Sequence, residues 1–274
     1  MSGIPNVLSI AGSDPSGGAG IQADLKTFAA FGCYGMAAIT ALTAQNTLGV
    51  RAVHVPPAEF LAAQIDAIFE DIEVDAVKIG MLGAGEIVAV VADRLAHHGA
   101  RNIVLDPVLV ATSGDSLGAP GVVDALLTKL MPLAAVVTPN IPEAARLVGR
   151  DVSPDPDDMI RAGQDLLARG AQAVLVKGGH GEGAEAIDAL VTEHGAALFG
   201  APRIATRNTH GTGCSLSSAI AAGLARGREL TQAVNEAKLW LTEAIRAADG
   251  LSVGRGHGPL DHMHAQRPRA TGGA

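Results

Sequence analysis

A glycine-rich stretch close to the end of the chain has the residue types of a phosphate-binding loop. It reads Asn208-Thr209-His210-Gly211-Thr212-Gly213-Cys214. The small and apolar residues 215–225 that follow predict a helix, and glycines at alternate positions let backbone N–H groups converge at its positive end as an anion hole. The same field is expected to lower the pKa of the Cys214 thiol, so that Cys214 could accept a proton. The alternative is a glycine-rich turn with a buried structural cysteine.

A second glycine-rich loop lies near the start of the chain, after an apolar run that predicts a strand. It reads Gly12-Ser13-Asp14-Pro15-Ser16-Gly17-Gly18-Ala19-Gly20. Residues 18–23 match the fingerprint of dinucleotide-binding folds, but that fingerprint requires an acidic residue about twenty positions later. No Asp or Glu occurs between Lys26 and Glu59, and the chain has neither a P-loop sequence nor protein-kinase motifs. A nucleotide must therefore be bound by other means, and a flexible turn is the alternative for this loop.

Charged and polar residues follow three further predicted strands. They stand in Asp106-Pro107-Val108, Thr138-Pro139-Asn140-Ile141-Pro142-Glu143 and Lys177-Gly178-Gly179-His180. Each stretch alone is more often a turn or a helix cap than a site. In an open α/β sheet, however, the carboxyl ends of the parallel strands lie at one edge, and ligands bind just beyond it. The loops that follow these strands therefore meet at the edge where a ligand would bind. Two acids, an amide, a lysine and an anion hole at that edge have the parts needed for magnesium-assisted phosphoryl transfer.

These residues depend on a regular alternation of predicted strands and helices. Short β-rich runs, most of them apolar throughout, alternate with longer Ala- and Leu-rich stretches, which is typical of a largely parallel sheet covered on both faces. The predicted strands are residues 7–11, 37–43, 50–55, 76–79, 103–106, 135–138, 174–177, 189–192 and 196–199. The predicted helices are residues 20–31, 58–70, 85–97, 121–129, 142–148, 157–168, 214–225 and 231–248. With no linker or fixed-period repeat, one domain over residues 1–263 is expected, followed by a disordered tail at 264–274.

The composition excludes several classes of protein. The chain has 274 residues, 48% of them hydrophobic, with 28 acidic and 20 basic residues and a formal net charge of −8. This excludes a wholly disordered chain and argues against a nucleic-acid partner, because the net charge repels a phosphate backbone. Residues 27–50 contain no charged residue, yet their polar side chains and glycines favour a buried passage over a membrane span. Two cysteines, and an apolar run at 7–11 too short for a signal peptide, favour a cytoplasmic protein.

Five motifs occur in a defined order along the chain. They are residues 12–24, Thr43-Ala44-Gln45-Asn46-Thr47, Lys78-Ile79-Gly80-Met81-Leu82, Asp106-Pro107-Val108 and residues 208–214. In type and order they resemble the hydroxymethylpyrimidine/phosphomethylpyrimidine kinases of thiamine biosynthesis, a branch of the ribokinase-like superfamily, and the resemblance extends from about Val7 to Met263. It implies an α/β, ribokinase-like fold with a central, mostly parallel β-sheet flanked by helices on both faces, usually as a homodimer. It also implies an ATP- and Mg²⁺-dependent enzyme that phosphorylates 4-amino-5-hydroxymethyl-2-methylpyrimidine to its monophosphate and then to the diphosphate.

The resemblance also implies roles for individual residues. The catalytic set would be Cys214, Gly211, Gly213 and Lys177, with Cys214 at the position where most ribokinase-like sugar kinases have an aspartate base. An aminopyrimidine edge presents both hydrogen-bond donors and acceptors, and the side chains of an Asp and a Gln can form hydrogen bonds with them. The residues implied to contact the pyrimidine are Gly12, Asp24, Gln45, Met81 and Val108. Those implied to bind ATP are Asn140, Lys177, Thr209 and Thr212, and those for the metal ion are Asp106 and Glu143.

Two other functions stay open at this point. A pyridoxal or pyridoxine kinase of the same superfamily phosphorylates the hydroxymethyl group of a pyridine ring of similar size, although Gln45 and Met81 favour the pyrimidine. A phosphate-binding protein without turnover would need neither Cys214 nor the two acids. Cys33 is predicted to be a core residue, and the adjacent histidines 97 and 98 do not face the same way on a helix and so are not expected to bind a metal. His210 is left open as a ligand contact, and residues 254–260 resemble the family's closing motif without an assigned role.

Overall fold

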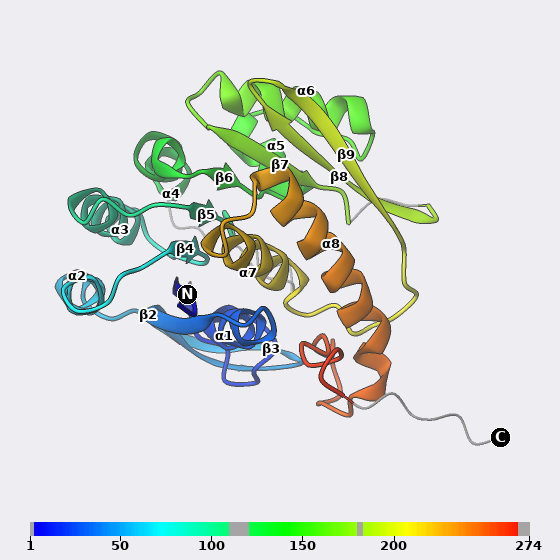
Figure 1. Cartoon of the computed structure of the whole chain (residues 1–274), viewed down its shortest axis with the longest axis horizontal. Coiled ribbons are helices and arrows are strands. Elements are labelled where there is room, and N and C mark those ends of the chain that lie inside the picture. Colours follow the sequence, from blue (N-terminus) through cyan, green and yellow to red (C-terminus); the bar gives the residue numbers. More distant parts are fainter. Residues whose placement is uncertain (1–2, 110–120, 180–182, 268–274) are drawn as a thin grey trace.

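A nine-stranded sheet forms the centre of the molecule (Figure 1). The computed structural model describes residues 3–109, 121–179 and 183–267. The strands are β1 (Asn6–Gly12), β2 (Tyr34–Asn46), β3 (Gly49–His54), β4 (Ala76–Ile79), β5 (Ile103–Leu105), β6 (Val136–Val137), β7 (Ala173–Lys177), β8 (Glu185–Thr192) and β9 (Gly195–Pro202). Their order across the sheet is β3-β2-β1-β4-β5-β6-β7-β8-β9. All pairs from β2 to β7 are parallel, whereas β3, β8 and β9 pair antiparallel at the two edges, which confirms the predicted, mostly parallel sheet.

Helices cover both faces of this sheet, as expected. They are α1 (Gly20–Ala30), α2 (Ala58–Phe69), α3 (Gly85–His97), α4 (Val122–Ala125), α5 (Ile141–Val148), α6 (Pro156–Leu167), α7 (Thr212–Ala225) and α8 (Leu230–Ala247). Buried side chains of α2 to α6 pack in one core, and those of α1, α7 and α8 pack in a second core on the opposite face. In Figure 1, strands β4 to β6 accordingly run between α2, α3 and α4 on one side and α7 on the other.

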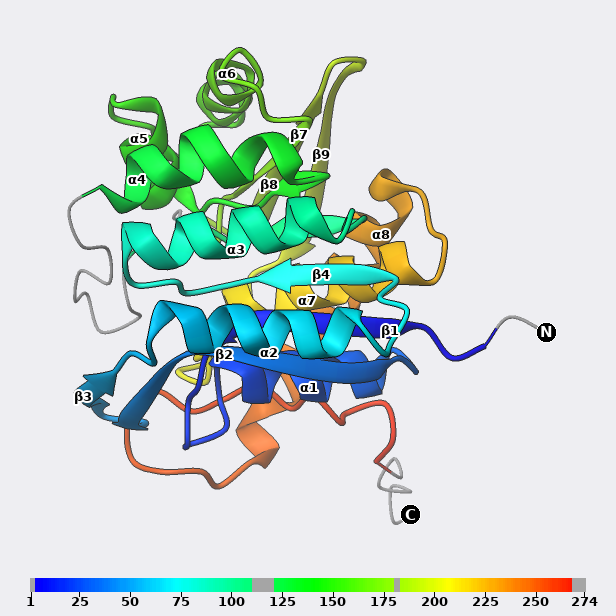
Figure 2. The same ribbon diagram turned by 90° about the vertical axis from the view of Figure 1, so that its left-hand side faces the viewer.

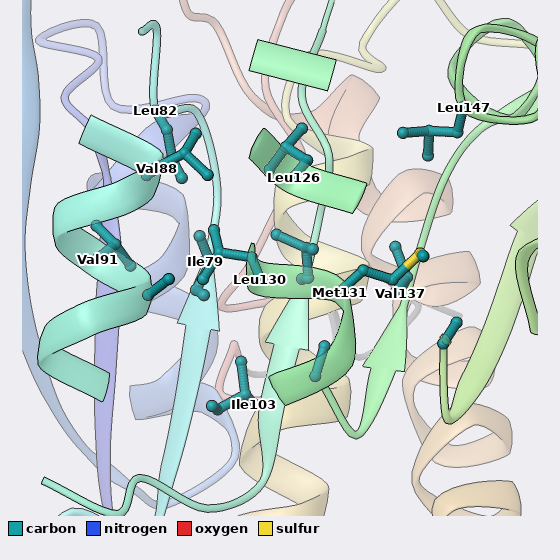
Figure 3. Close-up of a cluster of buried hydrophobic side chains, with 14 of the residues drawn as sticks. Ile79, Leu82, Val88, Val91, Ile103, Leu126, Leu130, Met131, Val137 and Leu147 are labelled. Carbon is teal, nitrogen blue, oxygen red and sulfur yellow. The ribbon is translucent and has the colours of Figure 1, made fainter. Parts of the chain in front are cut away.

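The two cores follow from the two-residue period of a strand. In β5, Ile103 and Leu105 belong to the first core, whereas Val104 between them belongs to the second. Because the central strands are buried on both faces, their sequences are mostly apolar, with buried polar exceptions such as Ser9 in β1 and Lys78 in β4. Figure 3 shows the first core between α3 and strands β4 to β6, where Ile79 lies beside Leu130 and Val137 lies beside Met131.

The segment after residue 121 differs from the expected plain helix. Only α4 is α-helical; Leu126–Leu130 form a π-helix and Met131–Leu133 a 3-10 helix. The predicted single α-helix over 121–129 is therefore wrong, and Pro132, which has no N–H group to continue the ladder of hydrogen bonds, marks the end of the π-helix. The first turn of α7 also begins at Thr212, two residues before the predicted start at Cys214.

Residues 264–267 of the predicted tail lie within the described part of the chain. His264 to Arg267 form turns, and the Arg267 Nε atom donates a hydrogen bond of 2.7 Å to Asp261 Oδ2. Residues 268–274 lie outside the described part of the chain, so disorder there stays a prediction. Cys33 is 7% exposed within the second core, as predicted. Over the three described ranges, no helix is long and apolar enough to cross a membrane.

We expect the substitution Leu95→Ala in α3 to lower the free energy of unfolding by about 2–5 kcal/mol. The Leu95 side chain is 1% exposed in the first core, so its truncation loses buried apolar surface and leaves a cavity. The control is Leu239→Ala in α8, where the side chain is 58% exposed and the loss should stay below about 0.5 kcal/mol. Urea unfolding followed by circular dichroism measures both values, and similar losses in the two variants would contradict this assignment of the core.

Candidate functional site

The carboxyl ends of the parallel strands open into a cavity of about 530 Å³. Its floor and walls come from the loops after β1, β4, β5, β6 and β7, the hairpin β2–β3, the loop before α7, and one face of α8. Of the residues implicated from the sequence, those that line the cavity are Gly12, Gln45, Met81, Asp106, Val108, Asn140, Glu143, Lys177, Thr209, Gly211, Thr212, Gly213 and Cys214. The tertiary structure therefore brings together positions as far apart in the sequence as Gly12 and Cys214.

The two glycine-rich loops are packed directly against each other. Gly211 has φ +83°, and a Cβ atom there would lie 1.9 Å from the carbonyl oxygen of Gly18. Gly211 is also the N-cap residue of α7, so the free N–H groups of the first turn begin at this contact. A Cβ on Gly213 would lie 3.4 Å from Lys177 Nζ. The same Cβ would lie 3.8 Å from Asp106 Oδ2, so the N-terminus of α7 lies beside both Lys177 and Asp106, at a place where the helix dipole and the lysine can attract an anion.

An aspartate and a histidine hold these two loops in place. The Asp14 carboxylate accepts hydrogen bonds from the backbone of Ala19, at 2.8 Å, and from the Ser16 side chain, at 2.6 Å. His210 Nε2 lies 2.8 Å from Asp14 Oδ2. Burial would raise the pKa of Asp14, but the hydrogen bonds from His210, Ser16 and Ala19 outweigh it and lower that pKa to about 2. Asp14 is therefore a carboxylate at neutral pH that joins the first loop to the second.

Lys177 and Asp106 form a buried ion pair at the ends of β7 and β5. The Lys177 Nζ atom donates to Asp106 Oδ1 at 2.7 Å, and the hydroxyl of Thr138 donates to the same oxygen at 3.2 Å. Burial acts to raise the pKa of Asp106, but Lys177 and Lys78 more than compensate and lower it. Burial in turn acts to lower the pKa of Lys177, and the facing carboxylates raise it. Both groups are consequently charged at neutral pH.

Glu143 occupies a capping box at the start of α5. Its Oε2 atom accepts from the Asn140 backbone N–H at 2.8 Å, and the Asn140 side chain accepts from the Glu143 N–H at 2.9 Å. The side chain is 3% exposed, and this burial raises the pKa of Glu143 to about 7, with a further increase from the Asp106 charge. The two acids predicted for a metal therefore line one cavity. No cluster of three or more His, Cys, Asp or Glu residues suited to a metal occurs in residues 3–109, 121–179 and 183–267.

The prediction that the Cys214 thiol has a lowered pKa is wrong. Cys214 lies at the first turn of α7, but burial raises the pKa of this thiol to about 11. The positive charge of Lys78 opposes that increase, whereas the carboxylates of Asp24 and Asp106 add to it. The field of the helix terminus is thus outweighed by desolvation and by two nearby anions, and the thiol is neutral at pH 7.

Asp24 does not line the cavity, in contrast to the expectation that it contacts a pyrimidine. Its side chain is fully buried, and Lys78 Nζ donates to both carboxylate oxygens at 2.9 Å. The hydroxyl groups of Ser9 and Ser218 also donate to it, at 2.6 and 2.7 Å. With four hydrogen bonds to protein groups, this carboxylate has no oxygen free for a ligand and serves to neutralise Lys78.

Several residues of the cavity wall were not identified from the sequence. Lys78 stood in one of the motifs without an assigned role, although a lysine inside an apolar strand is a signal of a buried ion pair. A further wall carries Ala201, Ile204, Leu241 and Ile245, from β9, the loop after it and α8. Beside this wall, Lys238 Nζ of α8 donates to Asp188 Oδ2 of β8 at 2.7 Å. These residues look like ordinary amphipathic positions in the sequence, so only their assembly around the cavity reveals them.

We expect Cys214 to be a poorly reactive thiol in the folded protein. With a pKa of about 11, about 0.1% of Cys214 is thiolate at pH 8, against roughly a quarter of an ordinary cysteine with a pKa of about 8.5. Alkylation by iodoacetamide at pH 8 should be at least roughly 30-fold slower than in the urea-unfolded chain, and should accelerate about tenfold per pH unit up to pH 10. Peptide mass spectrometry separates Cys214 from Cys33, and equal rates in the folded and unfolded chain would contradict a raised pKa.

Comparisons with known proteins identify the family of this chain. A family model described as phosphomethylpyrimidine kinase matches residues 14–261. The hydroxymethylpyrimidine/phosphomethylpyrimidine kinase of Salmonella typhimurium is 52% identical over 260 residues, which cover 95% of this chain and 98% of that protein.

Solved structures of two related kinases have the same fold. A phosphomethylpyrimidine kinase from Clostridium difficile 630 has a TM-score of 0.79 at 46% identity, covering 88% of this chain and 99% of that chain. The pyridoxal kinase from Staphylococcus aureus in complex with AMP-PCP and pyridoxal has a TM-score of 0.88 at 33% identity, covering 97% and 96%. The fold is therefore ribokinase-like, as predicted, and the chain belongs to the phosphomethylpyrimidine kinase family.

Proposed function

We propose that this protein transfers a phosphoryl group from ATP to the hydroxymethyl group of 4-amino-5-hydroxymethyl-2-methylpyrimidine, and then phosphorylates the monophosphate to the diphosphate, for thiamine biosynthesis. The observation that carries the proposal is a single cavity. One part of it contains a neutral thiol, a glycine-rich anion hole and a buried lysine, and another part has polar and apolar side chains that can hold a small ring. The family match and the relatives' names support the same activity.

The pyrimidine is assigned to the end of the cavity formed by Gly12, Gln45, Met81 and Val108. A Cβ atom on Gly12 would lie 2.6 Å from the Met81 methyl carbon, so the glycine allows Met81 to line this wall. The amide of Gln45 supplies both a donor and an acceptor to an aminopyrimidine edge. Thioether and valine side chains supply apolar contact to the faces of the ring. This part of the cavity thus matches a flat, polar-edged molecule.

The phosphate groups of ATP are assigned to the opposite side, between the N-terminus of α7 and Lys177. Lys177 Nζ would lie 3.4 Å from a Cβ of Gly213, in the first turn of α7, so its charge and the helix terminus act on the same part of the cavity. Thr209, Thr212 and Asn140 line the same region. The likeness to a kinase structure that contains AMP-PCP supports the use of ATP. These fixed charges and dipoles stabilise negative charge without reorganisation during the reaction.

We assign Mg²⁺ to the carboxylates of Asp106 and Glu143. Mg²⁺ is usually held by one or two carboxylates together with waters and substrate phosphates, and this pair at the phosphate side of the cavity fits that donor set. When bound, the ion would neutralise charge on the phosphates. Lys177 already neutralises Asp106, so Glu143 is the carboxyl group whose protonation responds to an added cation.

Cys214 contacts the hydroxyl group that is phosphorylated. Its thiol is neutral at pH 7, so the chain accelerates the reaction chiefly by positioning the hydroxyl and by stabilising charge; the hydroxyl proton leaves late and passes to an oxygen of the transferred phosphoryl group as the P–O bond to the leaving phosphate breaks. A loose transition state for phosphoryl transfer makes little demand on a strong base.

A second candidate function is the phosphorylation of pyridoxal. The pyridoxal kinase of Staphylococcus aureus covers nearly the whole chain in its structural match, and its substrate ring has a similar size. One mass-resolved product assay with ATP and Mg²⁺ tests both activities by offering hydroxymethylpyrimidine, its monophosphate and pyridoxal in parallel. We expect the diphosphate from the first two substrates and slow turnover of pyridoxal; turnover of pyridoxal alone would overturn the assignment of Gln45 and Met81 to the pyrimidine.

Two variants test the roles assigned to the charge of Lys177 and to the thiol of Cys214. Lys177→Met should lower kcat by at least about 100-fold, because it removes the cation that faces the transferred phosphate. Cys214→Ser should lower kcat by less than Lys177→Met does, since the thiol is not required as a strong base. Circular dichroism confirms that each variant is folded before its rate is compared, and a greater loss in Cys214→Ser would contradict this division of roles.

The wider setting of the protein is part of the proposal. Both cysteines are free, which supports the cytoplasm as its location. The single sheet, which joins strands from residue 6 to residue 202, supports one domain over residues 1–263. The net charge of −8 supports a small-molecule enzyme without a nucleic-acid partner.

We also propose that the protein is a homodimer that buries the hairpin β2–β3. β3 is an edge strand, and the apolar side chains of Leu42 and Leu48 on this hairpin are 47% and 69% exposed. Such an exposed apolar edge is normally covered in a native protein. Figure 2 shows the hairpin at one end of the molecule, where a second copy can reach it.

Sedimentation velocity should give a mass of twice 27.6 kDa for the parent protein. The double variant Leu42→Glu and Leu48→Glu should shift it to a monomer, because two charges would be buried at the interface. Leu239→Glu, at a position 58% exposed on α8, is the control and should stay dimeric. A monomeric parent protein at micromolar concentration would exclude the dimer.

A further inference from the structure

The segment 254–260, which we call the closing segment, has no side chain in the cavity wall. It reads Gly254-Arg255-Gly256-His257-Gly258-Pro259-Leu260. It follows α8 and the short 3-10 helix Ala248–Gly250. In Figure 2 this part of the chain, orange to red, runs along the lower side of the molecule from the region of β3 back past α1. Its contacts at both ends indicate what it does.

The first end of the closing segment is bonded to the tip of the hairpin β2–β3. The Gly256 N–H donates to Thr47 Oγ1 at 3.2 Å, and the His257 N–H donates to the Thr47 carbonyl oxygen at 3.1 Å. A Cβ atom on Gly256 would lie 1.9 Å from that carbonyl oxygen, and one on Gly254 would lie 2.2 Å from the Thr47 hydroxyl. Because the obstacle at Gly256 is backbone, no side-chain rotation can make room for a larger residue there.

The second end is bonded to the loop that precedes α7. The His210 N–H donates to the Gly258 carbonyl oxygen at 3.0 Å, and His210 forms an isolated parallel bridge with Pro259. A Cβ atom on Gly258 would lie 1.9 Å from the Asn208 side-chain oxygen. Residues 258–260 are buried, and Leu260 is 2% exposed within the second core. This end is therefore fixed to the body of the protein.

The closing segment thus connects two walls of the cavity from outside. Thr47 stands two residues after Gln45, which lines the cavity from the hairpin. His210 stands next to Gly211, where the anion hole begins. Among the residues that the structure describes, the edge strand β3 pairs only with β2, so contacts outside the sheet help to hold the hairpin in position.

We propose that the closing segment is a positioning device that holds the hairpin β2–β3 in register with the anion-hole loop. Its contacts with Thr47 fix where Gln45 meets the substrate ring. Its contacts with His210 fix that position relative to the phosphate site. Gly256 and Gly258 are glycines because their partners approach within the space of a Cβ atom. The consequence for the reaction rests on the function proposed above, whereas the consequence for the hairpin does not.

The test compares Gly256→Ala with Gly250→Ala. At Gly250 a Cβ atom would meet nothing within 4 Å, so this variant should match the parent protein. In Gly256→Ala we expect amide hydrogen exchange in residues 42–54 to accelerate about tenfold or more, with exchange in β4 to β7 unchanged. We also expect the KM for hydroxymethylpyrimidine to rise about tenfold while the KM for ATP changes less than about twofold.

The outcomes separate the possible failures. Unchanged exchange in the hairpin of a folded Gly256→Ala protein overturns the proposal, and so does faster exchange across the whole sheet, which would indicate general destabilisation. A parent protein that leaves hydroxymethylpyrimidine unphosphorylated refutes the proposed function, while the exchange result still tests the closing segment.

A second pair of variants covers the case in which Gly256→Ala does not fold. Thr47→Val keeps the volume of the side chain but removes the acceptor for the Gly256 N–H, and should raise exchange in the hairpin and the KM for the pyrimidine about threefold. Thr47→Ser keeps the acceptor and should restore the parent values. Equal behaviour of the two Thr47 variants would overturn the role of this contact.

Discussion

Two lysines buried at the ends of central strands impose the constraint on which the site depends. Lys78 is fully buried at the end of β4, and Lys177 is 9% exposed at the end of β7. An unpaired charge at such depth would cost several kcal/mol, so each lysine requires a carboxylate of fixed position. Asp24 of α1 forms an ion pair with Lys78, and Asp106 after β5 forms an ion pair with Lys177.

Helix α7 is held between these two ion pairs. Its consecutive residues Ser217 and Ser218 donate hydrogen bonds to Asp106 Oδ2, at 3.3 Å, and to Asp24 Oδ1, at 2.7 Å. Residues 215–223 of the helix are all buried, and they are small enough to let it lie against β4 and β5. The charge balance of the two lysines therefore also sets where the N-terminus of α7 points. An anion hole formed by that terminus is as rigid as the buried pairs beneath it.

The same burial decides the chemistry of Cys214. Removal from water strengthens the lysine–carboxylate pairs, but it also disfavours a thiolate, and the two compensating aspartates disfavour it further. The site therefore combines paired lysines and the positive end of a helix, which attract phosphate, with a thiol that stays neutral. In such a site, rate enhancement comes from position and from electrostatic stabilisation of the phosphates more than from a base.

The sequence by itself determined the fold class, most elements and those cavity residues that follow the parallel strands, but not the wall formed by β9 and α8. Largely apolar runs identified the parallel strands, and loops that follow parallel strands must meet at one edge, which is why Asp106, Asn140 and Lys177 could be grouped correctly. Local rules were sufficient there because each signal lies within a few residues of its strand.

Only the tertiary structure decided which charged groups pair with one another and which distant segments are in contact. Asp24 was expected at the substrate and instead neutralises Lys78, since the partner of a buried charge depends on which strand lies beside the helix. The pKa of Cys214 was misjudged for the same reason: the helix terminus is visible in the sequence, whereas desolvation and neighbouring carboxylates are not. The contact of Gly256 with Thr47 joins positions 209 residues apart, and no local pattern encodes that distance.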